Sequence, residues 1–270
     1  AQNVTMNRKL LQSGLIDHIF IQPASWDAGT ALGAAFQVHM NQTGKRPDVG
    51  FDHPYWGPEF GDPEIETALR QLGVNNFHRS KNVFTDTARY LEENKVIGWF
   101  QGRLEIGARA LGNRSILGNP KNPDTKELIN TKIKGREPWR PFAPSIQEEY
   151  AHQFLERHYP SPFMLLSFKV KSDKADEIIS ATHVDGTCRP QTVSKNINPA
   201  YWNLIEEFRK RTGVPVILNT SFNLSDEPIV CSPQDALKTF FRCGMDVLVM
   251  GNIIVEKTSG DYCGPPLLKK

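Results

Sequence analysis

Short apolar segments with the pattern of strands alternate with helical segments along most of this chain, and this alternation strongly constrains the fold. Helices and strands in such an order bury their apolar sides against one another around a sheet. The last two strand candidates, 246–250 and 253–257, are separated only by Gly251-Asn252, which predicts an antiparallel hairpin. We therefore predict an α/β fold with a twisted mixed sheet. The other expected strands are 18–22, 96–100, 163–170 and 214–218, and the expected helices are 31–36, 62–73, 85–93, 122–133, 199–211 and 232–244.

Changes in composition divide the 270 residues into four predicted parts. Residues 1–40 hold a strand candidate and a helix of small residues. Residues 41–80 form a connector, because closely spaced Pro, Gly and aromatic residues leave room only for one short helix. Residues 81–260 hold most of the alternating pattern, and 261–270 form a tail. The chain begins without Met, from which we expect it to be the C-terminal part of a longer protein.

The overall composition disfavours several classes of protein. Apolar residues make up 39% and charged residues 23%, as in ordinary globular proteins. The net charge of +2 gives no support to binding of nucleic acid or a membrane surface, and no apolar run approaches the ~20 residues of a membrane helix. The four cysteines form no Cys-x-x-Cys pair, so we expect neither structural zinc nor a disulfide framework, and we predict a cytoplasmic location.

A loop rich in arginine and glycine is the first candidate for chemistry. Residues 102–115 follow the strand candidate 96–100 and place Arg103, Arg109 and Arg114 among three glycines. Glycine lets backbone N–H groups approach an anion, and guanidinium groups bind phosphate through paired hydrogen bonds. Any one of these arginines alone fits a solvated surface position, but such charges favour helix faces with acids four residues away. As a group they predict a phosphate-binding loop.

Three further segments carry groups that suit phosphate oxygens or a ribose. Residues 132–144 supply the cations Lys134, Arg136 and Arg140, and residues 185–189 supply Thr187 and Arg189. The third segment directly follows the strand candidate 214–218 and supplies small amides and hydroxyls. An Asn/Ser turn explains the third segment equally well. If the loops converge at the ends of the strands, they form an anion pocket. The residues concerned are Lys134, Arg136, Arg140, Thr187, Arg189, Asn219, Ser221 and Asn223.

Common catalytic motifs give no competing explanation. The chain has no Walker A loop, and no Gly-x-Gly-x-x-Gly follows a strand candidate. No Ser-His-Asp or Cys-His arrangement is evident. The seven histidines are scattered along the chain, and we expect each of them to be structural.

Five ordered motifs resemble the carbamoyltransferases of nodulation factors and antibiotics, a family that includes the tobramycin and cephalosporin carbamoyltransferases. The longest motif is WFQGRLEIGARALGNRSIL at 99–117. The others are RPFAP at 140–144, HVDGT at 183–187, LNTSFN at 218–223 and EPIV at 227–230. The resemblance covers nearly the whole chain, and five motifs in the same order make it specific.

This resemblance implies two domains. Residues 1–40 are implied to be the C-terminal remnant of an actin/hexokinase-like transferase domain, and 81–260 to be an α/β domain similar to threonylcarbamoyl-adenylate synthases. Those synthases bind their adenylate through Lys-x-Arg and Ser-x-Asn, which here correspond to Lys134 to Arg136 and Ser221 to Asn223. Asp27 matches a metal-binding Asp of related transferases. It is implied to be one ligand of a divalent metal, expected to be iron, whose other ligands lie in a missing N-terminal domain; a helix N-cap is its alternative role.

The resemblance also implies a two-step reaction. ATP and carbamoyl phosphate first form carbamoyl-adenylate, and the carbamoyl group then passes to a hydroxyl of a sugar or natural product at the metal site. Two alternatives are a threonylcarbamoyl-adenylate synthase, which residues 1–35 disfavour, and a nucleic-acid-binding module, which the net charge disfavours. The implied catalytic residues are Lys134, Arg140 and Arg109. The residues implied to bind ATP are Arg103, Arg114, Arg136, Thr187, Arg189, Asn219, Ser221 and Asn223.

Overall fold

The computed structural model describes residues 1–157, 159–258, 260–261 and 264. The strands among them are β1 Phe77–Arg79, β2 Ile97–Phe100, β3 Arg114–Gly118, β4 Ala143–Gln147, β5 Phe168–Lys169, β6 Thr187–Cys188, β7 Gln191–Val193, β8 Val216–Ser221, β9 Val247–Met250 and β10 Ile253–Glu256. The α-helices are α1 Val4–Gln12, α2 Thr30–Thr43, α3 Asp62–Gln71, α4 Val83–Glu92, α5 Thr125–Leu128, α6 Ala151–Phe154, α7 Pro199–Thr212 and α8 Pro233–Phe241. Other helical segments are η1 Asp27–Gly29, η2 Ile129–Lys134, η3 Glu148–Tyr150 and η4 Ser172–Ala181.

Eight of these strands form one mixed sheet in the order β1-β10-β9-β2-β3-β8-β4-β7, and β5 pairs with β6 separately. β2 runs parallel to β9, and β4 runs parallel to β7, whereas the other neighbours in the sheet are antiparallel. The predicted hairpin is confirmed by β9 and β10, with Met250 opposite Ile253. The predicted α/β fold with a mixed sheet is therefore confirmed.

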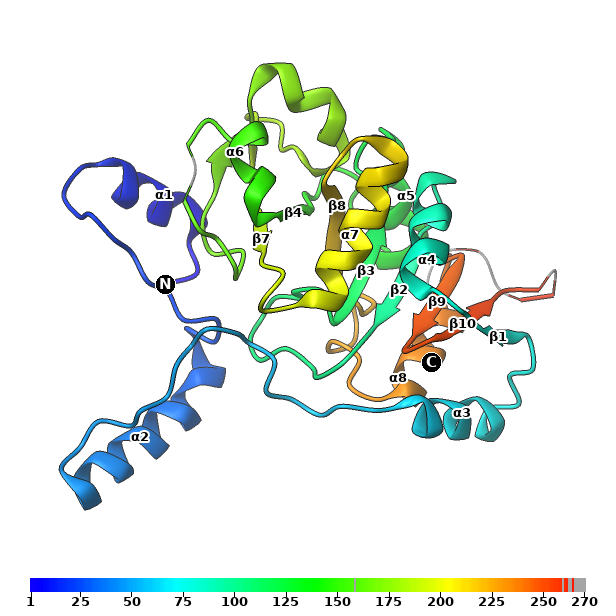
Figure 1. The fold of residues 1–270 in the computed structure, drawn as a ribbon, viewed down its shortest axis with the longest axis horizontal. Helices are drawn as coiled ribbons and strands as arrows, with labels where there is room; N and C mark the ends of the chain where they lie inside the picture. Colours follow the sequence, from blue (N-terminus) through cyan, green and yellow to red (C-terminus); the bar gives the residue numbers. More distant parts are fainter. Residues whose placement is uncertain (158, 259, 262–263, 265–270) are drawn as a thin grey trace.

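Helices cover both faces of the large sheet (Figure 1). On one face, Leu91 of α4 and Phe208 of α7 belong to the same buried core as Trp99 of β2. On the other face, Phe240 of α8 belongs to a second core that contains Phe100. Successive side chains of a strand point to opposite faces, so the neighbours Trp99 and Phe100 enter different cores. β2 is buried along its whole length, as expected for a strand covered on both sides.

Two predicted strands are wrong in whole or in part. Residues 18–22 form no strand, because the main chain of Ile19 bonds to a side chain: the Tyr159 hydroxyl accepts its N–H at 3.0 Å and donates to its carbonyl at 3.1 Å. Within 163–170, only Phe168–Lys169 pairs as β5. The apolar residues that precede β5 pack as a buried loop. A short apolar run indicates burial, but burial alone does not distinguish a strand from a packed loop.

Most other predicted elements are present with shifted ends. The strand expected at 214–218 is β8, which begins at Val216 and continues through Asn219 to Ser221, two of the residues predicted to follow it. α3 begins at Asp62 as predicted, although Gly61 is its N-cap. The sequence patterns do not predict β1, β3 or β4. β3 begins within the segment interpreted as an arginine loop, and β4 contains Pro144, which is unfavourable in a strand.

The N-terminal segment lies at one side of the molecule (Figure 1). α1 is anchored by Asn7, whose side chain donates a hydrogen bond to the carbonyl of Leu165 at 2.9 Å. α2 projects away from the sheet, and none of its residues is buried. Among the described residues, no helix combines the length and apolarity needed to cross a membrane. The predicted division into four parts stays a prediction, and most of the predicted tail lies outside the described residues.

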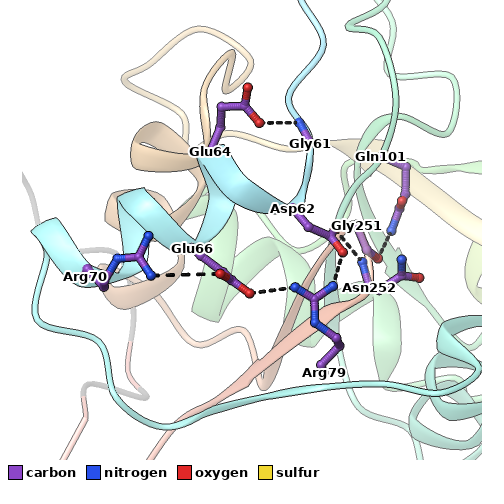
Figure 2. Close-up of polar contacts among 9 residues, drawn as sticks. All are labelled: Gly61, Asp62, Glu64, Glu66, Arg70, Arg79, Gln101, Gly251 and Asn252. Atoms are coloured by element: carbon purple, nitrogen blue, oxygen red, sulfur yellow. Dashed lines mark hydrogen bonds and ion pairs between the residues drawn. The ribbon is translucent and has the colours of Figure 1, made fainter.

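A polar junction holds the start of α3 against the turn between β9 and β10 (Figure 2). Asp62 pairs with Arg79 of β1 and accepts the backbone N–H of Asn252 at 3.4 Å. Gln101, which follows β2, donates to the carbonyl of Gly251 at 2.8 Å. A side chain at Gly251 would place its Cβ 2.4 Å from Asp62 Oδ1, so the close approach requires glycine there. The junction thereby fixes the position from which the arginine loop departs.

Candidate anion site

The loop that follows β2 is organised by a buried carboxylate. Glu105 Oε1 accepts hydrogen bonds from the backbone N–H groups of Leu111 at 2.7 Å, Asn113 at 2.9 Å and Arg114 at 3.2 Å. A carboxylate with several backbone donors is a strong anchor, because each bond involves a charged acceptor. Arg109 lies between the carboxylate and these donors in sequence. Glu105 therefore fixes the loop that carries Arg109, a role that the sequence analysis missed.

Lys134 contacts the loop that follows β8. Its ammonium group donates to the carbonyl of Ser221 at 2.5 Å, to the carbonyl of Asn223 at 2.8 Å and to Asn223 Oδ1 at 2.8 Å. η2 ends at Lys134, because Gly135 adopts a left-handed backbone conformation. Burial lowers the pKa of Lys134 to about 7, with a smaller contribution from the positive charge of Arg136. The structure thus brings together the Lys-x-Arg and Ser-x-Asn segments.

Three arginines come from separate loops, and two of them, Arg109 and Arg136, lie close enough for their charges to act on the third, Arg189. We call the three residues the arginine cluster. Burial lowers the pKa of all three, and the charges of Arg109 and Arg136 further lower the pKa of Arg189, to about 9. In the part of the chain that the structure describes, no ion pair joins any of them to a carboxylate. The Nε atoms of Arg109 and Arg189 are buried without a hydrogen-bond partner. The arginine cluster therefore has the charge and the unused donors that an anion requires.

Arg136 and Arg140 flank the turn after η2. Arg136 donates from Nε to Asn130 Oδ1 at 2.7 Å and lies over the ring of Phe142, 5.0 Å from its centre. Arg140 is half exposed, and its Nε lies 3.9 Å from the Glu137 carboxylate. Its positive charge also lowers the pKa of Arg136, so Arg140 lies close enough to extend the arginine cluster at the exposed side.

Thr187 and Asn219 are both buried, and each bonds to partners inside the protein. The hydroxyl of Thr187 bonds to the Asp185 carboxylate at 2.6 Å, within the turn that leads to Arg189. Asn219 is buried, and its amide donates to Ser145 Oγ at 3.1 Å and Gln191 Oε1 at 3.2 Å. Asn219 therefore supports the strands beneath the site in this structure, and the sequence analysis missed the two partners that it holds.

Two predicted ATP ligands, Arg114 and Arg103, donate hydrogen bonds to backbone carbonyls of the protein. Arg114 is fully buried, lies 3.6 Å from the centre of the Phe100 ring and donates to backbone carbonyls, including that of Gln101 at 2.8 Å. Its N–H groups are thus used inside the protein and are not free for a phosphate group. This corrects the prediction that Arg114 binds ATP. Arg103 is exposed and donates to the carbonyl of Trp56 at 3.1 Å, on the side of the connector.

Asp27 does not form a metal site with its neighbours. It is exposed at the start of η1, and its carbonyl, not its carboxylate, accepts the hydroxyl of Thr30. Over the described ranges, no group of three or more His, Cys, Asp or Glu side chains is arranged to hold a metal ion. The N-cap of α2 is Gly29, so the alternative role of Asp27 as the cap of that helix is wrong.

Comparison with protein families decides what kind of protein this is. The model described as Carbamoyltransferase C-terminus matches residues 88–257, well over half of the chain. The chain belongs to the carbamoyltransferase family. The model described as Carbamoyltransferase N-terminus matches residues 1–36. The larger match contains the whole arginine cluster, Lys134 and the loop after β8.

Relatives of the chain include two nodulation proteins. The chain is 47% identical over 262 residues to nodulation protein NolNO of Sinorhizobium fredii. The aligned region covers 95% of this chain and 38% of that protein. It is 46% identical over 262 residues to nodulation protein NolO of Bradyrhizobium diazoefficiens, covering 95% and 48%. The chain thus spans less than half the length of these relatives. The predicted likeness to nodulation carbamoyltransferases is confirmed, whereas the likeness to the antibiotic enzymes stays a prediction.

A solved structure of P. abyssi Sua5 complexed with L-threonine is a weak structural match. It has a TM-score of 0.44 and 14% identity, and it covers 63% of this chain and 46% of that one. At this score the likeness supports no argument about the site. The predicted similarity of 81–260 to the synthases, and of 1–40 to an actin-like domain, therefore stays a prediction.

Proposed function

We propose that this chain binds ATP and carbamoyl phosphate beside the arginine cluster and joins them into carbamoyl-adenylate. One observation carries the proposal: Lys134 contacts Ser221 and Asn223, 87 and 89 residues further along the chain, next to three arginines without paired carboxylates. Both proposed substrates are polyanions, and a site that holds both needs several fixed cations. Surface charges would lie apart and would pair with neighbouring acids.

The charges of the site suit this chemistry. Carbamoyl phosphate, ATP and one water give carbamoyl-adenylate, pyrophosphate and phosphate, so negative charge develops on two leaving groups. Fixed cations around those groups stabilise the charge without reorganisation during the reaction. Burial lowers the pKa of Lys134 to about 7, and an anion bound beside it favours the charged ammonium group. We assign catalysis to Lys134, Arg109 and Arg140, and nucleotide binding to Arg136, Arg189, Ser221 and Asn223, with Thr187 beside them.

The second step, transfer to a hydroxyl of a sugar or natural product, is proposed for a protein of the length of the relatives. The resemblance assigns that step to a metal site that includes Asp27 and to an N-terminal domain. The described residues around Asp27 do not fit a metal by themselves. No step proposed for this chain is routed through that site. The cytoplasmic location rests on the cysteine pattern and stays a prediction.

The proposal is tested by measuring pyrophosphate released from ATP with and without carbamoyl phosphate. The wild-type chain should release pyrophosphate only when both substrates are present. Arg136→Met should slow release at least about tenfold, because a hydrogen bond to a charged group contributes ~1.5–3 kcal/mol. Arg70→Met, at an exposed arginine on α3, is the matched control and should keep the wild-type rate. An unchanged rate in Arg136→Met, or no calorimetric binding of ATP to the wild type, would contradict the proposal.

A further inference from the structure

His183, Asp185 and Thr187 form a hydrogen-bonded chain in the turn that leads to Arg189. The Asp185 carboxylate accepts the backbone N–H of Thr187 at 3.0 Å and its hydroxyl at 2.6 Å. The same hydroxyl oxygen lies 3.2 Å from Nδ1 of His183. The backbone N–H of His183 donates to the carbonyl of Thr187 at 2.7 Å and closes the turn. Backbone and side-chain bonds therefore hold the imidazole in place.

The directions of these hydrogen bonds favour the tautomer of the imidazole with its hydrogen on Nδ1. Bonds from Thr187 lower the pKa of Asp185, so its carboxylate is charged near neutral pH and can only accept. The Thr187 hydroxyl has one hydrogen, which it donates to Asp185. Its oxygen is then left to accept a hydrogen from Nδ1 of His183. Nδ1 thus carries a hydrogen in both charge states, and Nε2 is the atom that gains or loses the proton.

Opposing charges surround the ring of His183. Burial lowers its pKa below the ordinary value of 6.5, and the positive charges of Arg189 and Lys126 act in the same direction. The charge of Asp185 and a backbone hydrogen bond to Phe142 favour the protonated ring. The balance leaves the ring neutral near pH 7 when no anion is bound.

We propose that His183 is a further member of the anion site and takes up a proton from solvent at Nε2 when a tetrahedral dianion binds beside Arg189. The inference rests on the proposed function, which places phosphate groups there. A dianion offsets the positive field that keeps His183 neutral, while Asp185 and Phe142 continue to favour the charged ring. The protonated imidazole then adds one positive charge next to the ligand. The expectation that each histidine is structural would be wrong for His183.

Sulfate is the probe, because it remains a dianion near neutral pH and exchanges no proton itself. NMR of ¹⁵N-labelled histidine reports which ring nitrogen carries a hydrogen and the pH midpoint of each ring. His183→Asn identifies the signals of His183. We expect the Nδ1–H tautomer in the neutral ring and a midpoint that rises by about one pH unit in saturating sulfate, a tenfold change in proton affinity. His78, exposed on β1, is the control and should not shift.

Calorimetry of sulfate binding in buffers of different ionisation enthalpy gives the number of protons taken up. Lys134 titrates in the same range, so the informative quantity is the difference between the wild type and His183→Asn, whose amide can keep the bond to Thr187. We expect this variant to lose most of one proton. Sulfate binding without a shifted His183 midpoint, or a neutral ring protonated at Nε2, overturns this inference and leaves the proposed function standing. No sulfate binding at all overturns both.

Discussion

Arg189→Met should stabilise the fold while it weakens anion binding. The pKa of Arg189 is lowered from 12.5 to about 9, so below that pH the folded state carries a cost that the unfolded state does not. At ~1.4 kcal/mol per tenfold change, the upper limit of this cost is about 5 kcal/mol. The side chain is partly exposed, so water screens some of it, and Met loses a few packing contacts. We expect a net gain of about 1–2 kcal/mol.

Urea denaturation at neutral pH and low salt, without phosphate or sulfate, measures this gain as a higher free energy of unfolding. For a chain of this size, the midpoint of thermal unfolding should rise by roughly 2–8 °C. Sulfate should stabilise the wild type more than the variant, because a ligand stabilises the folded state in proportion to its occupancy. Calorimetry should show ATP affinity reduced about tenfold or more in Arg189→Met.

The control for this prediction is Arg70→Met, which removes an exposed arginine from α3. Its free energy of unfolding should stay within ~0.5 kcal/mol of the wild type. The interpretation of the arginine cluster is refuted if Arg189→Met is less stable than the wild type at low salt and still binds ATP with wild-type affinity. That result would mean that Arg189 is held by partners inside the protein rather than kept for a ligand.

Three further predictions follow from the site and its supports. Gly112→Ala should lower the free energy of unfolding by roughly 2–4 kcal/mol in urea denaturation, because the new Cβ would lie 2.2 Å from the Tyr201 ring at a φ of +102°. Gly213→Ala is the control: its Cβ would meet open space at a φ of +79°, and the loss should be only about 1 kcal/mol. Ser221→Ala should weaken binding of ATP more than that of carbamoyl phosphate in calorimetry, and equal losses would contradict the nucleotide assignment. ATP affinity should fall as pH rises through about 7, where Lys134 loses its charge, and calorimetry between about pH 6 and 9 should show a weaker fall in Lys134→Met.

The contact between Lys134 and the loop after β8 was predictable, but the position of Arg114 was not. A family resemblance relates Lys134 to Ser221 and Asn223 directly, and the structure places them in contact. Arg114 has the same chemistry as Arg109 and lies in the same motif. Only the strand pairing of β3 shows that Arg114 begins a buried strand and donates to carbonyls inside the protein.

Fold elements with a single strong pattern were predicted well. β2 is buried on both faces, and its run of apolar residues indicates this directly. β3 and β4 were missed because their residues do not resemble strands: β3 begins with an arginine, and β4 contains a proline. β4 pairs with β8, which is distant in sequence, and β3 lies between β8 and β2. Such tertiary pairing overrides local preference.

Glu105 and Gln191 show why supporting residues escape sequence analysis. An acid among arginines suggests an ion pair, yet Glu105 bonds to backbone N–H groups of its own loop. Gln191 is a polar residue on a short strand, and its amide holds the carbonyl of Leu111 at 2.8 Å. Neither residue type identifies its partner when that partner is a backbone group. The N–H groups bound by Glu105 and the carbonyl bound by Gln191 all belong to the loop after β2, and only the fold of that loop shows these contacts.

The position of β2 in the sheet has a consequence for synthesis of the chain on the ribosome. β3 is made soon after β2 and pairs with one edge of it, but the other edge waits for β9, where Val247 pairs with Ile97. Until β9 has left the ribosome, the nascent protein presents an unpaired edge between two apolar faces. Pairing across such a sequence separation slows folding and leaves incomplete chains prone to aggregate. The central strand therefore stays open to wrong pairing until residues 247–250 have been made.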